Sequence, residues 1–288
     1  MPWDVIKDIL LDSLKDSGLV FIFVFLVHLL LSFIDHQFAN FLVKRKKTSP
    51  LFGALFGLIP QCGTSVLGAD LYIKKYISIG TLTAIFLSCS DEAFISILTS
   101  GKGDKIIMIL PLMGLKFLIG FIIGYLFDLI NRKQNIIQVD EVEEEHECHT
   151  HHHENTKVHR HLVHPLIHSL EIFIYVLIIN IGFSVLIYYI GEDNFKNFII
   201  TNRYLTPLYS SIIGLIPNCA SSLFLSELFI DGSLSFGALL SGLLVNAGLG
   251  MMILLKSKHK GKDILFIFLV CFITAIISGY ITCLISGF

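Results

Sequence analysis

The chain has 288 residues, of which 54% are hydrophobic and 15% are charged, and its mean hydropathy is +0.75. Soluble proteins carry about 25% charged residues, so this chain has too little polar surface to cover itself in water. The formal net charge of −2 is small, and we expect no nucleic-acid partner. The composition therefore excludes a soluble protein and predicts one that is embedded in a lipid bilayer.

Apolar segments that indicate membrane spans recur along the chain, and a span across about 30 Å of hydrocarbon takes about 20 residues. In chain order they cover residues 19–33, 51–73, 77–98, 106–130, 166–190, 208–230, 236–255 and 264–285. A polar stretch between the fourth and the fifth is first acidic and then rich in histidine. We therefore expect a first membrane repeat over residues 1–131, a His-rich acidic cytoplasmic loop over residues 132–164 and a second membrane repeat over residues 165–288.

The two groups of apolar segments are copies of one another. The motif Gly-Leu-Ile-Pro at residues 57–60 returns 157 residues later, at residues 214–217. The same offset relates Cys62 to Cys219, Ser65 to Ser222, Gln61 to Asn218, Thr64 to Ser221 and Asp70 to Glu227. Chance does not give such a run of matches, so the sequence predicts a duplicated chain.

A polar elbow that begins with proline interrupts the second apolar segment at residues 60–65, and its copy at residues 217–222. Each arm is too short to cross the bilayer as a helix, so the arms form either one interrupted span or a re-entrant hairpin. The hairpin places most lysines and arginines on the side of the His-rich loop, as the positive-inside rule favours. We therefore predict an all-α polytopic membrane protein with two inverted-topology repeats, broken or re-entrant helices and about eight to ten membrane segments, with both termini outside.

The elbows carry thiol, amide and hydroxyl groups at matched positions, next to backbone groups that proline frees from helical hydrogen bonding. Irregular backbone at membrane depth is tolerated only where it is buried in protein or lines a wet cavity. Small residues also allow helices to pack closely, but close packing does not account for a thiol and an amide in both halves. The elbow residues expected to bind substrate are Gln61, Cys62, Thr64, Ser65, Asn218, Cys219, Ser221 and Ser222.

The third apolar segment contains two adjacent carboxylates, Asp91 and Glu92. A charge at the centre of a membrane helix costs about 2.5–3.5 kcal/mol on insertion scales, a cost that a divalent cation or a proton relay would justify. The alternative is that the pair lies near a helix end and is neutralised by a lysine. If residues 77–98 form one helix, Ser88 and Asp91 share a face and Cys89 and Glu92 share the next. The second half keeps only Asn246 as a polar residue here, so the substrate-binding candidates Ser88, Cys89, Asp91, Glu92 and Asn246 form an asymmetric set.

Three further charged residues are candidates for gating or coupling. Lys116 lies in the middle of the fourth segment, and its expected partner is Asp91 or Glu92. Lys116 either forms a structural ion pair, or its charged side chain occupies the empty cation site and leaves when a metal ion arrives. Asp70 and Glu227 follow the two elbows at matched positions, and we expect them to be secondary ligands or gates.

The loop between the halves contains imidazole and thiol groups that suit Zn²⁺, Cu and Ni²⁺. Its irregular spacing argues against one rigid zinc site and favours a loose, exchangeable metal-collecting arm. A polar linker without metal is the alternative. The candidate metal ligands are His146, Cys148, His149, His151, His152, His153, His159 and His161.

The paired Gly-Leu-Ile-Pro-x-Cys-x-x-Ser elbows, the two-half layout and the central His-rich loop resemble a family of ten-helix heavy-metal exporters. Members of that family are labelled arsenic efflux proteins or manganese transporters. The chain is also distantly similar to organoarsenical permeases, which carry a Pro-x-Cys elbow in each half. The resemblance covers nearly the whole chain and implies export of a metal or metalloid ion from the cell.

The sequence thus predicts a multi-pass transporter of the inner, or plasma, membrane and not an enzyme. Its substrate is a heavy-metal ion, with a divalent ion such as Mn²⁺ or Zn²⁺ favoured by the carboxylates and histidines. Arsenite or an organoarsenical is the alternative substrate, and a membrane-anchored metal sensor is the alternative of another class. No phosphate-binding Gly-x-x-x-x-Gly-Lys-Ser/Thr loop is present, so the driving force should be an ion gradient, of protons or another ion, or the membrane potential. No cofactor is expected.

Overall fold

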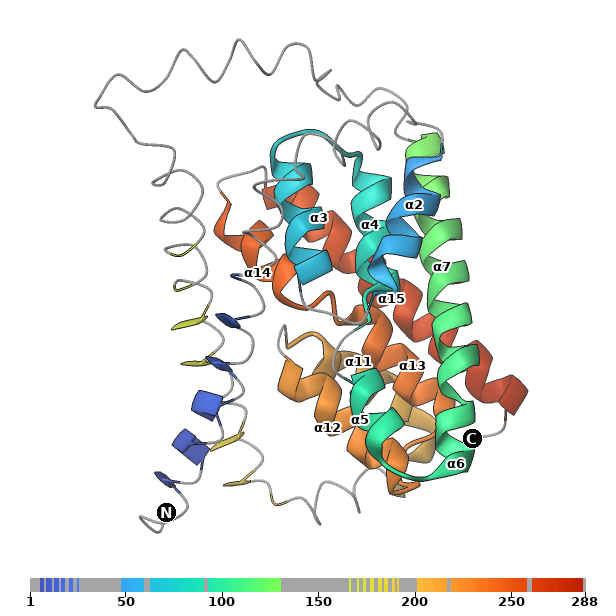
Figure 1. Ribbon diagram of the computed structural model, residues 1–288. Helices are drawn as coiled ribbons and strands as arrows, with labels where there is room; N and C mark the ends of the chain where they lie inside the picture. The colour runs from blue at the N-terminus through green and yellow to red at the C-terminus, as the bar shows by residue number, and fades with distance from the viewer. Residues whose placement is uncertain are drawn as a thin grey trace.

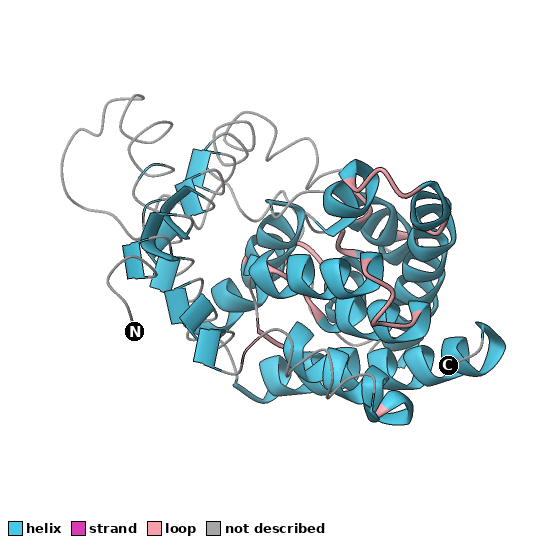
Figure 2. Ribbon diagram, turned by 90° about the horizontal axis from the view of Figure 1, so that it is seen from below, coloured by secondary structure: helices cyan, strands magenta, loops and turns pink. Residues whose placement is uncertain are grey.

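The computed structural model describes residues 48–59, 63–90, 93–130, 201–216, 219–257 and 261–286, together with isolated residues between 6 and 25 and between 166 and 191. Every element of regular structure in the six ranges is a helix, and loops occur only between helices (Figure 2). The prediction of an all-α protein is therefore confirmed for this part of the chain.

Apart from one short helix in each half, the described helices of the two halves follow the same order along the chain (Figure 1). Those of the first half are α2 (Ser49–Gly57), α3 (Gly63–Ile73), α4 (Ile79–Ser88), α5 (Ala93–Thr99), α6 (Gly103–Ile107) and α7 (Ile109–Ile130). The second half has the short 3₁₀ helix η3 (Arg203–Leu205), α11 (Thr206–Gly214), α12 (Cys219–Ile230), α13 (Phe236–Val245), α14 (Leu249–Lys256) and α15 (Gly261–Ser286). The bounds of α2, α4, α11 and α13 differ by the 157 residues that separate the sequence motifs.

Local sequence explains where these helices begin. A proline stands in the first turn of both α2 and α11, where its missing N–H costs no hydrogen bond. Ser78 caps α4 by accepting a hydrogen bond from the Thr81 amide at 3.1 Å. Ser235 caps α13 in the same way, from the Ala238 amide at 3.4 Å. The duplicated sequence therefore gives duplicated caps.

The helices pack in two equivalent groups that exchange one element. In the first half α4 packs against α2 and α7, and in the second half α13 packs against α11 and α15. However, α14 of the second half packs on α3, and α5 of the first half packs on α12. Figure 1 accordingly shows α14 in the upper part with α2, α3 and α4, and α5 in the lower part with α11, α12 and α13. The exchange is reciprocal, so each half completes the packing of the other.

Glycines set the close helix crossings, and they do so at equivalent positions. A Cβ on Gly57 would overlap Ser88 Oγ and lie 2.7 Å from the Ile85 carbonyl oxygen. A Cβ on Gly214 would likewise overlap the Gly242 carbonyl oxygen and lie 2.7 Å from Val245 Cγ1. These two glycines belong to the repeated motif, so the duplication extends from the sequence to the helix contacts.

Three stretches of the described chain are long and apolar enough to cross a membrane: Gly103–Ile130, Phe236–Lys256 and Asp263–Ser286. The second lies in the interior, with 83% of its most apolar window buried, whereas the first and third are 17% and 28% buried. Leucines and isoleucines at four-residue spacing cover the exposed sides of α7 and α15. Such faces suit contact with lipid, as expected of a multi-pass membrane protein.

Two apolar segments are each divided into two helices. Residues 77–98 are one apolar segment in the sequence, but α4 ends at Ser88 and α5 begins at Ala93. The apolar stretch 236–255 is also divided, because α13 ends at Val245 and α14 begins at Leu249. Neither stretch contains proline, and hydropathy alone does not reveal where polar side chains and glycine end a helix. The face-sharing that a continuous helix would impose on residues 88–92 therefore does not apply.

Candidate functional site

The two divided apolar segments are interrupted near the middle of the bundle, after α4 and after α13 (Figure 1). The residues that follow these two helices leave helical geometry. Cys89 follows α4 with an extended ψ of 123°, and the next amide, that of Ser90, donates to the Gly57 carbonyl over 3.0 Å. Asn246 follows α13, and Gly248 adopts φ 56° and ψ −150°, a conformation that L side chains rarely take. Backbone groups at both breaks are consequently free of the regular helical pattern.

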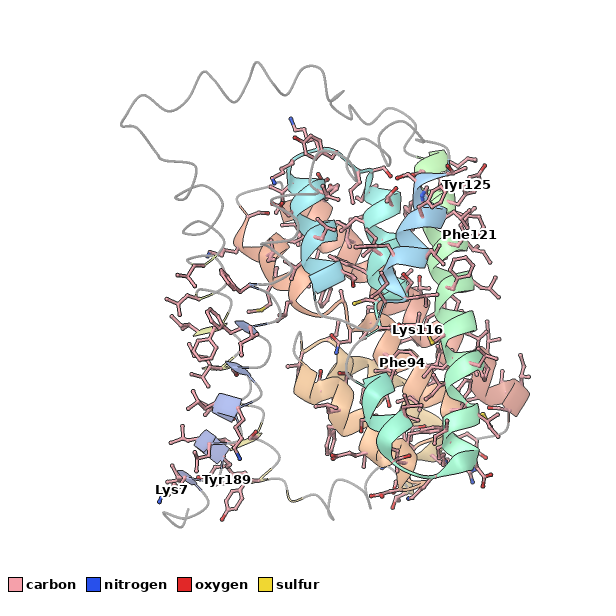
Figure 3. The ribbon with its side chains drawn as sticks, in the orientation of Figure 1. Lys7, Phe94, Lys116, Phe121, Tyr125 and Tyr189 are labelled. Atoms are coloured by element: carbon pink, nitrogen blue, oxygen red, sulfur yellow. The ribbon has the colours of Figure 1, made fainter. Side chains whose placement is uncertain are left out.

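The side chain of Lys116, on α7, contacts the C-terminal ends of α4 and α13. Its Nζ donates to the carbonyl oxygens of Cys89 and Leu243, the latter over 2.7 Å, and the residue is 1% exposed. The same Nζ lies 5.9 Å from the centroid of the Phe94 ring in α5 (Figure 3). One cationic group therefore contacts the end of α4, the end of α13 and the start of α5.

Buried hydroxyl and amide groups surround the second break. Asn246 donates from Nδ2 to Ser221 Oγ over 3.3 Å, and its Oδ1 accepts from the Gly248 amide at 3.0 Å. The Gly250 amide of α14 donates to Ser65 Oγ of α3 over 3.3 Å, which joins the two halves. These three polar side chains and two backbone amides are buried, as are Thr64 and Ser222. The centre of the molecule is thus polar, although the surrounding helices are apolar.

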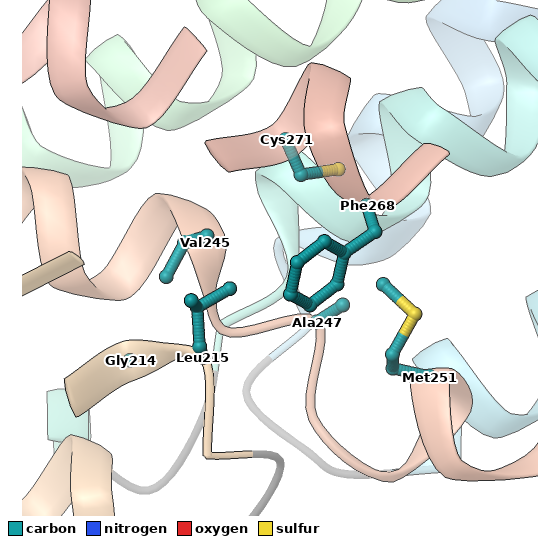
Figure 4. Close-up of a pocket in the computed structure, with 7 residues that line it drawn as sticks. All are labelled: Gly214, Leu215, Val245, Ala247, Met251, Phe268 and Cys271. Carbon is teal, nitrogen blue, oxygen red and sulfur yellow. The ribbon is translucent and has the colours of Figure 1, made fainter. Parts of the chain in front are cut away.

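A small cavity of about 10 Å³ lies beside the second break and has room for about one water-sized molecule. Figure 4 shows the residues that line it: Gly214, Leu215, Val245, Ala247, Met251, Phe268 and Cys271. The offset of 155 residues that relates Gly124 to Gly279 makes Cys271 the counterpart of Lys116. An apolar cavity beside a buried thiol therefore takes the place that a lysine side chain fills in the first half.

A protein-family profile described as "Putative, 10TM heavy-metal exporter" matches residues 6–185 and 170–287. The chain belongs to this family. The match confirms the resemblance drawn from the elbows and the His-rich loop. The family is described as one of multi-pass membrane transporters. No curated protein and no solved structure matches the chain.

The structure brings together five of the predicted substrate-binding residues of this family member. Ser65 accepts from the Gly250 amide, and Asn246 donates to Ser221. Ser221 also donates to the Ile216 carbonyl over 2.9 Å. Thr64 and Ser222 are buried beside them in the first turns of α3 and α12. The elbow hydroxyls are thus placed where both halves meet.

Ser88 and Cys89 lie at the end of α4, and they form hydrogen bonds through different groups, a side-chain hydroxyl and a backbone carbonyl. Ser88 Oγ donates back to the Ala84 carbonyl over 2.8 Å, so its hydroxyl serves its own helix. Cys89 contributes its backbone carbonyl to Lys116, and its thiol is buried and forms no disulfide. A substrate-binding role of the Cys89 side chain stays a prediction, and the backbone carbonyl of Cys89 is the group that contacts Lys116.

Asp70 and Glu227 lie away from the breaks. Asp70 forms an ion pair with Lys74 one turn later, at 2.8 Å, and both side chains are more than a third exposed. Glu227 is exposed on α12. Asp70 lies near the C-terminal end of α3. A gating role for it is a proposal.

Several predicted site residues lie outside the described part of the chain, and the structure does not address them. They are Gln61, Cys62, Asp91, Glu92, Asn218 and the side chain of Cys219, together with the loop residues His146, Cys148, His149, His151, His152, His153, His159 and His161. Among the residues that are described, no group of three or more His, Cys, Asp or Glu side chains could hold a metal ion.

The sequence did not point to Gly248 or to the carbonyl of Leu243. Gly248 carries the positive-φ turn of the second break, and its signal was available as the Asn-Ala-Gly run inside an apolar stretch. Leu243 contributes only a backbone carbonyl, which no sequence pattern distinguishes from those of the leucines around it.

Proposed function

We propose that the protein is a secondary-active transporter that exports a divalent heavy-metal ion, such as Mn²⁺ or Zn²⁺, across the plasma membrane. The observation that carries the proposal is the buried meeting of two helix ends, where the Cys89 and Leu243 carbonyls converge on one cationic group. Carbonyls at half-helix ends are typical cation ligands in transporters built from broken helices. The family description supports export of a heavy metal.

We further propose that the halves are inverted repeats and that α2–α3 and α11–α12 are re-entrant hairpins from opposite sides. The two hairpins occupy opposite parts of the bundle in Figure 1, which supports this topology. The reciprocal packing of α14 on α3 and of α5 on α12 supports it as well. In such transporters one repeat rocks against the other around a site near the midplane.

The donors at the centre favour a divalent ion over arsenite. Ser65, Ser221 and Asn246 supply hydroxyl and amide oxygen atoms, and the two carbonyls add further oxygen ligands. Hard and borderline divalent cations prefer such ligands, whereas arsenite prefers three thiolates. We propose that Asp91 and Glu92 supply the charge, that the cysteines Cys62 and Cys219 add softer donors, and that the His-rich loop collects metal from the cytoplasm.

The experiment is metal uptake into inside-out membrane vesicles that contain the protein, with Mn²⁺, Zn²⁺ and arsenite offered separately. We expect saturable uptake of a divalent ion that collapses when an ionophore dissipates the ion gradient. Uptake of arsenite alone, lost in Cys62→Ser or Cys219→Ser, would replace the divalent substrate with the metalloid. Absence of flux with every ion would refute the transporter.

A deletion of residues 146–164 separates transport from sensing. A collecting arm raises the local metal concentration, so the deletion should raise the half-saturating concentration and leave the maximal rate within about twofold. A membrane-anchored sensor would instead lose metal binding with the loop while substitutions in the elbows had no effect.

A further inference from the structure

Lys116 is a buried amine at the junction of both halves. It lies on α7, yet its two recorded acceptors belong to the end of α4 in its own half and to the end of α13 in the other half. A lysine head group has three donors and no acceptor, so it is suited to groups that only accept hydrogen bonds. Its position therefore couples the ends of two helices that belong to different halves.

Those acceptors carry partial negative charge. The last carbonyls of a helix have no partner within the helix, and the helix dipole adds to their negative potential. Leu243 lies in the last turn of α13, and Cys89 immediately follows α4. Two such ends directed at one point form a cation site, and the ammonium group of Lys116 fills it.

The second half shows that the fold does not require a lysine here. At the equivalent position on α15 stands Cys271, which is buried and lines the apolar cavity of about 10 Å³. α15 packs against α13 as α7 packs against α4, although the thiol makes no such bridge. The charge of Lys116 is thus an addition in one half only and not a packing element of the repeat.

We propose that the Lys116 ammonium is a tethered cation that occupies the carbonyl site while the transporter is empty and is displaced when the metal ion binds. This inference rests on the proposed function, because it assigns Lys116 a role in the transport cycle. Two positive charges repel one another at one site, so metal and ammonium alternate. The ammonium keeps the buried carbonyls paired during the return of the empty protein, a step in which unpaired carbonyls would be costly.

The test compares net export with metal–metal exchange in proteoliposomes that contain the full chain. Net export requires the return of the empty protein, whereas exchange of labelled for unlabelled metal does not. We expect Lys116→Met to slow net export of Mn²⁺ about 10- to 100-fold, the factor that the loss of a hydrogen bond to a charged group corresponds to. Exchange should continue within about threefold of the wild type, and Mn²⁺ should bind more tightly because its competitor is gone.

Lys116→Gln distinguishes the charge from the hydrogen bonds. Its amide can donate to both carbonyls but carries no charge. A cation role predicts that net export stays slow in this variant. Recovery of net export to the wild-type rate would overturn the proposal, because neutral donors would then suffice.

Cys271→Ala is the matched control, since it alters the equivalent buried position on α15 without touching the carbonyl site. We expect its net export to stay within about twofold of the wild type. Loss of exchange together with net export in a folded, monodisperse Lys116→Met protein would also overturn the proposal. Absence of Mn²⁺, Zn²⁺ and arsenite flux in the wild type would instead refute the transport function itself.

Discussion

Ser78 Oγ donates to Asp128 Oδ2 over 2.7 Å, and this bond joins the start of α4 to the end of α7. The second carboxylate oxygen of Asp128 accepts from the Gly80 amide at 3.1 Å. In the second half the equivalent serine, Ser235, lies 3.3 Å from the thiol of Cys283 instead. The repeat thus keeps the serine cap but strengthens it with a carboxylate in the first half only.

This asymmetry predicts unequal costs of removing the two caps. Ser78→Ala should lower the free energy of unfolding by about 2 kcal/mol, because it removes the cap and one hydrogen bond to a charged group. Ser235→Ala should cost about 1 kcal/mol, the usual value for a lost cap. The measurement is the rate at which the buried thiols of Cys89, Cys271 and Cys283 react with a dye on heating in detergent. Equal costs would contradict the role of Asp128.

A second prediction concerns the glycines of the repeated motif. Gly57→Ala and Gly214→Ala should each destabilise the protein by at least about 1–3 kcal/mol, because the added Cβ overlaps backbone or side-chain atoms of α4 or α13. Gly114→Ala on α7 is the control, since nothing lies within 4 Å of the place that its Cβ would take and alanine favours the helix. The same thiol-reactivity assay measures all three. Tolerance of alanine at Gly57 and Gly214 would show that these helix crossings are not close.

A third prediction uses the turn after α3 and its copy after α12. Lys75 has a φ of 60° and Gly232 a φ of 81°, so both lie in the left-handed region, which glycine occupies without strain. Lys75→Gly should therefore stabilise the protein by roughly 0.5–1 kcal/mol, and Gly232→Lys should destabilise it by a similar amount. Opposite shifts of the melting temperature would support the prediction. Shifts of the same sign would not agree with equivalent turns.

The fourth prediction tests the inverted topology. Lys74 and Asp231 are equivalent by the repeat, and both are exposed at the turn that follows a hairpin. If the repeats are inverted, a cysteine in place of Lys74 should react with an impermeant thiol reagent from the cytoplasmic side, and one in place of Asp231 from the outside. A background with Cys148→Ser provides the baseline, and Cys148 itself should react from the cytoplasm. Labelling of both positions from one side would exclude inverted repeats.

Local sequence was sufficient to predict the helical class, the duplication and the breaks near Pro60 and Pro217. Hydrophobic segments of spanning length and the chemistry of proline act over a few residues, so they are visible without a fold. The breaks after Ser88 and Val245 were not predicted, because Cys, Ser, Asn and Gly residues are also compatible with a membrane helix. Packing against Gly57 and Ser221 decides that these residues leave the helix.

The candidate site was predicted in part for the same reason. Matched elbows identified Ser65 and Ser221, which the structure places at the meeting of the halves. The partners of Lys116 could not be read in this way. Its expected acidic partners, Asp91 and Glu92, lie outside the described residues, and the acceptors found among the described residues are backbone carbonyls, which every residue carries.

By itself the sequence determined that this is a membrane protein of two related halves with polar elbows, because composition, apolar length and internal repetition are properties of the chain alone. Only the tertiary structure decided that α5 and α14 are exchanged between the halves and that Lys116 lies between the ends of α4 and α13. Both depend on contacts between residues more than a hundred positions apart, such as Lys116 and Leu243. Such contacts form where packing is tight and buried polar groups find partners, which no local pattern specifies.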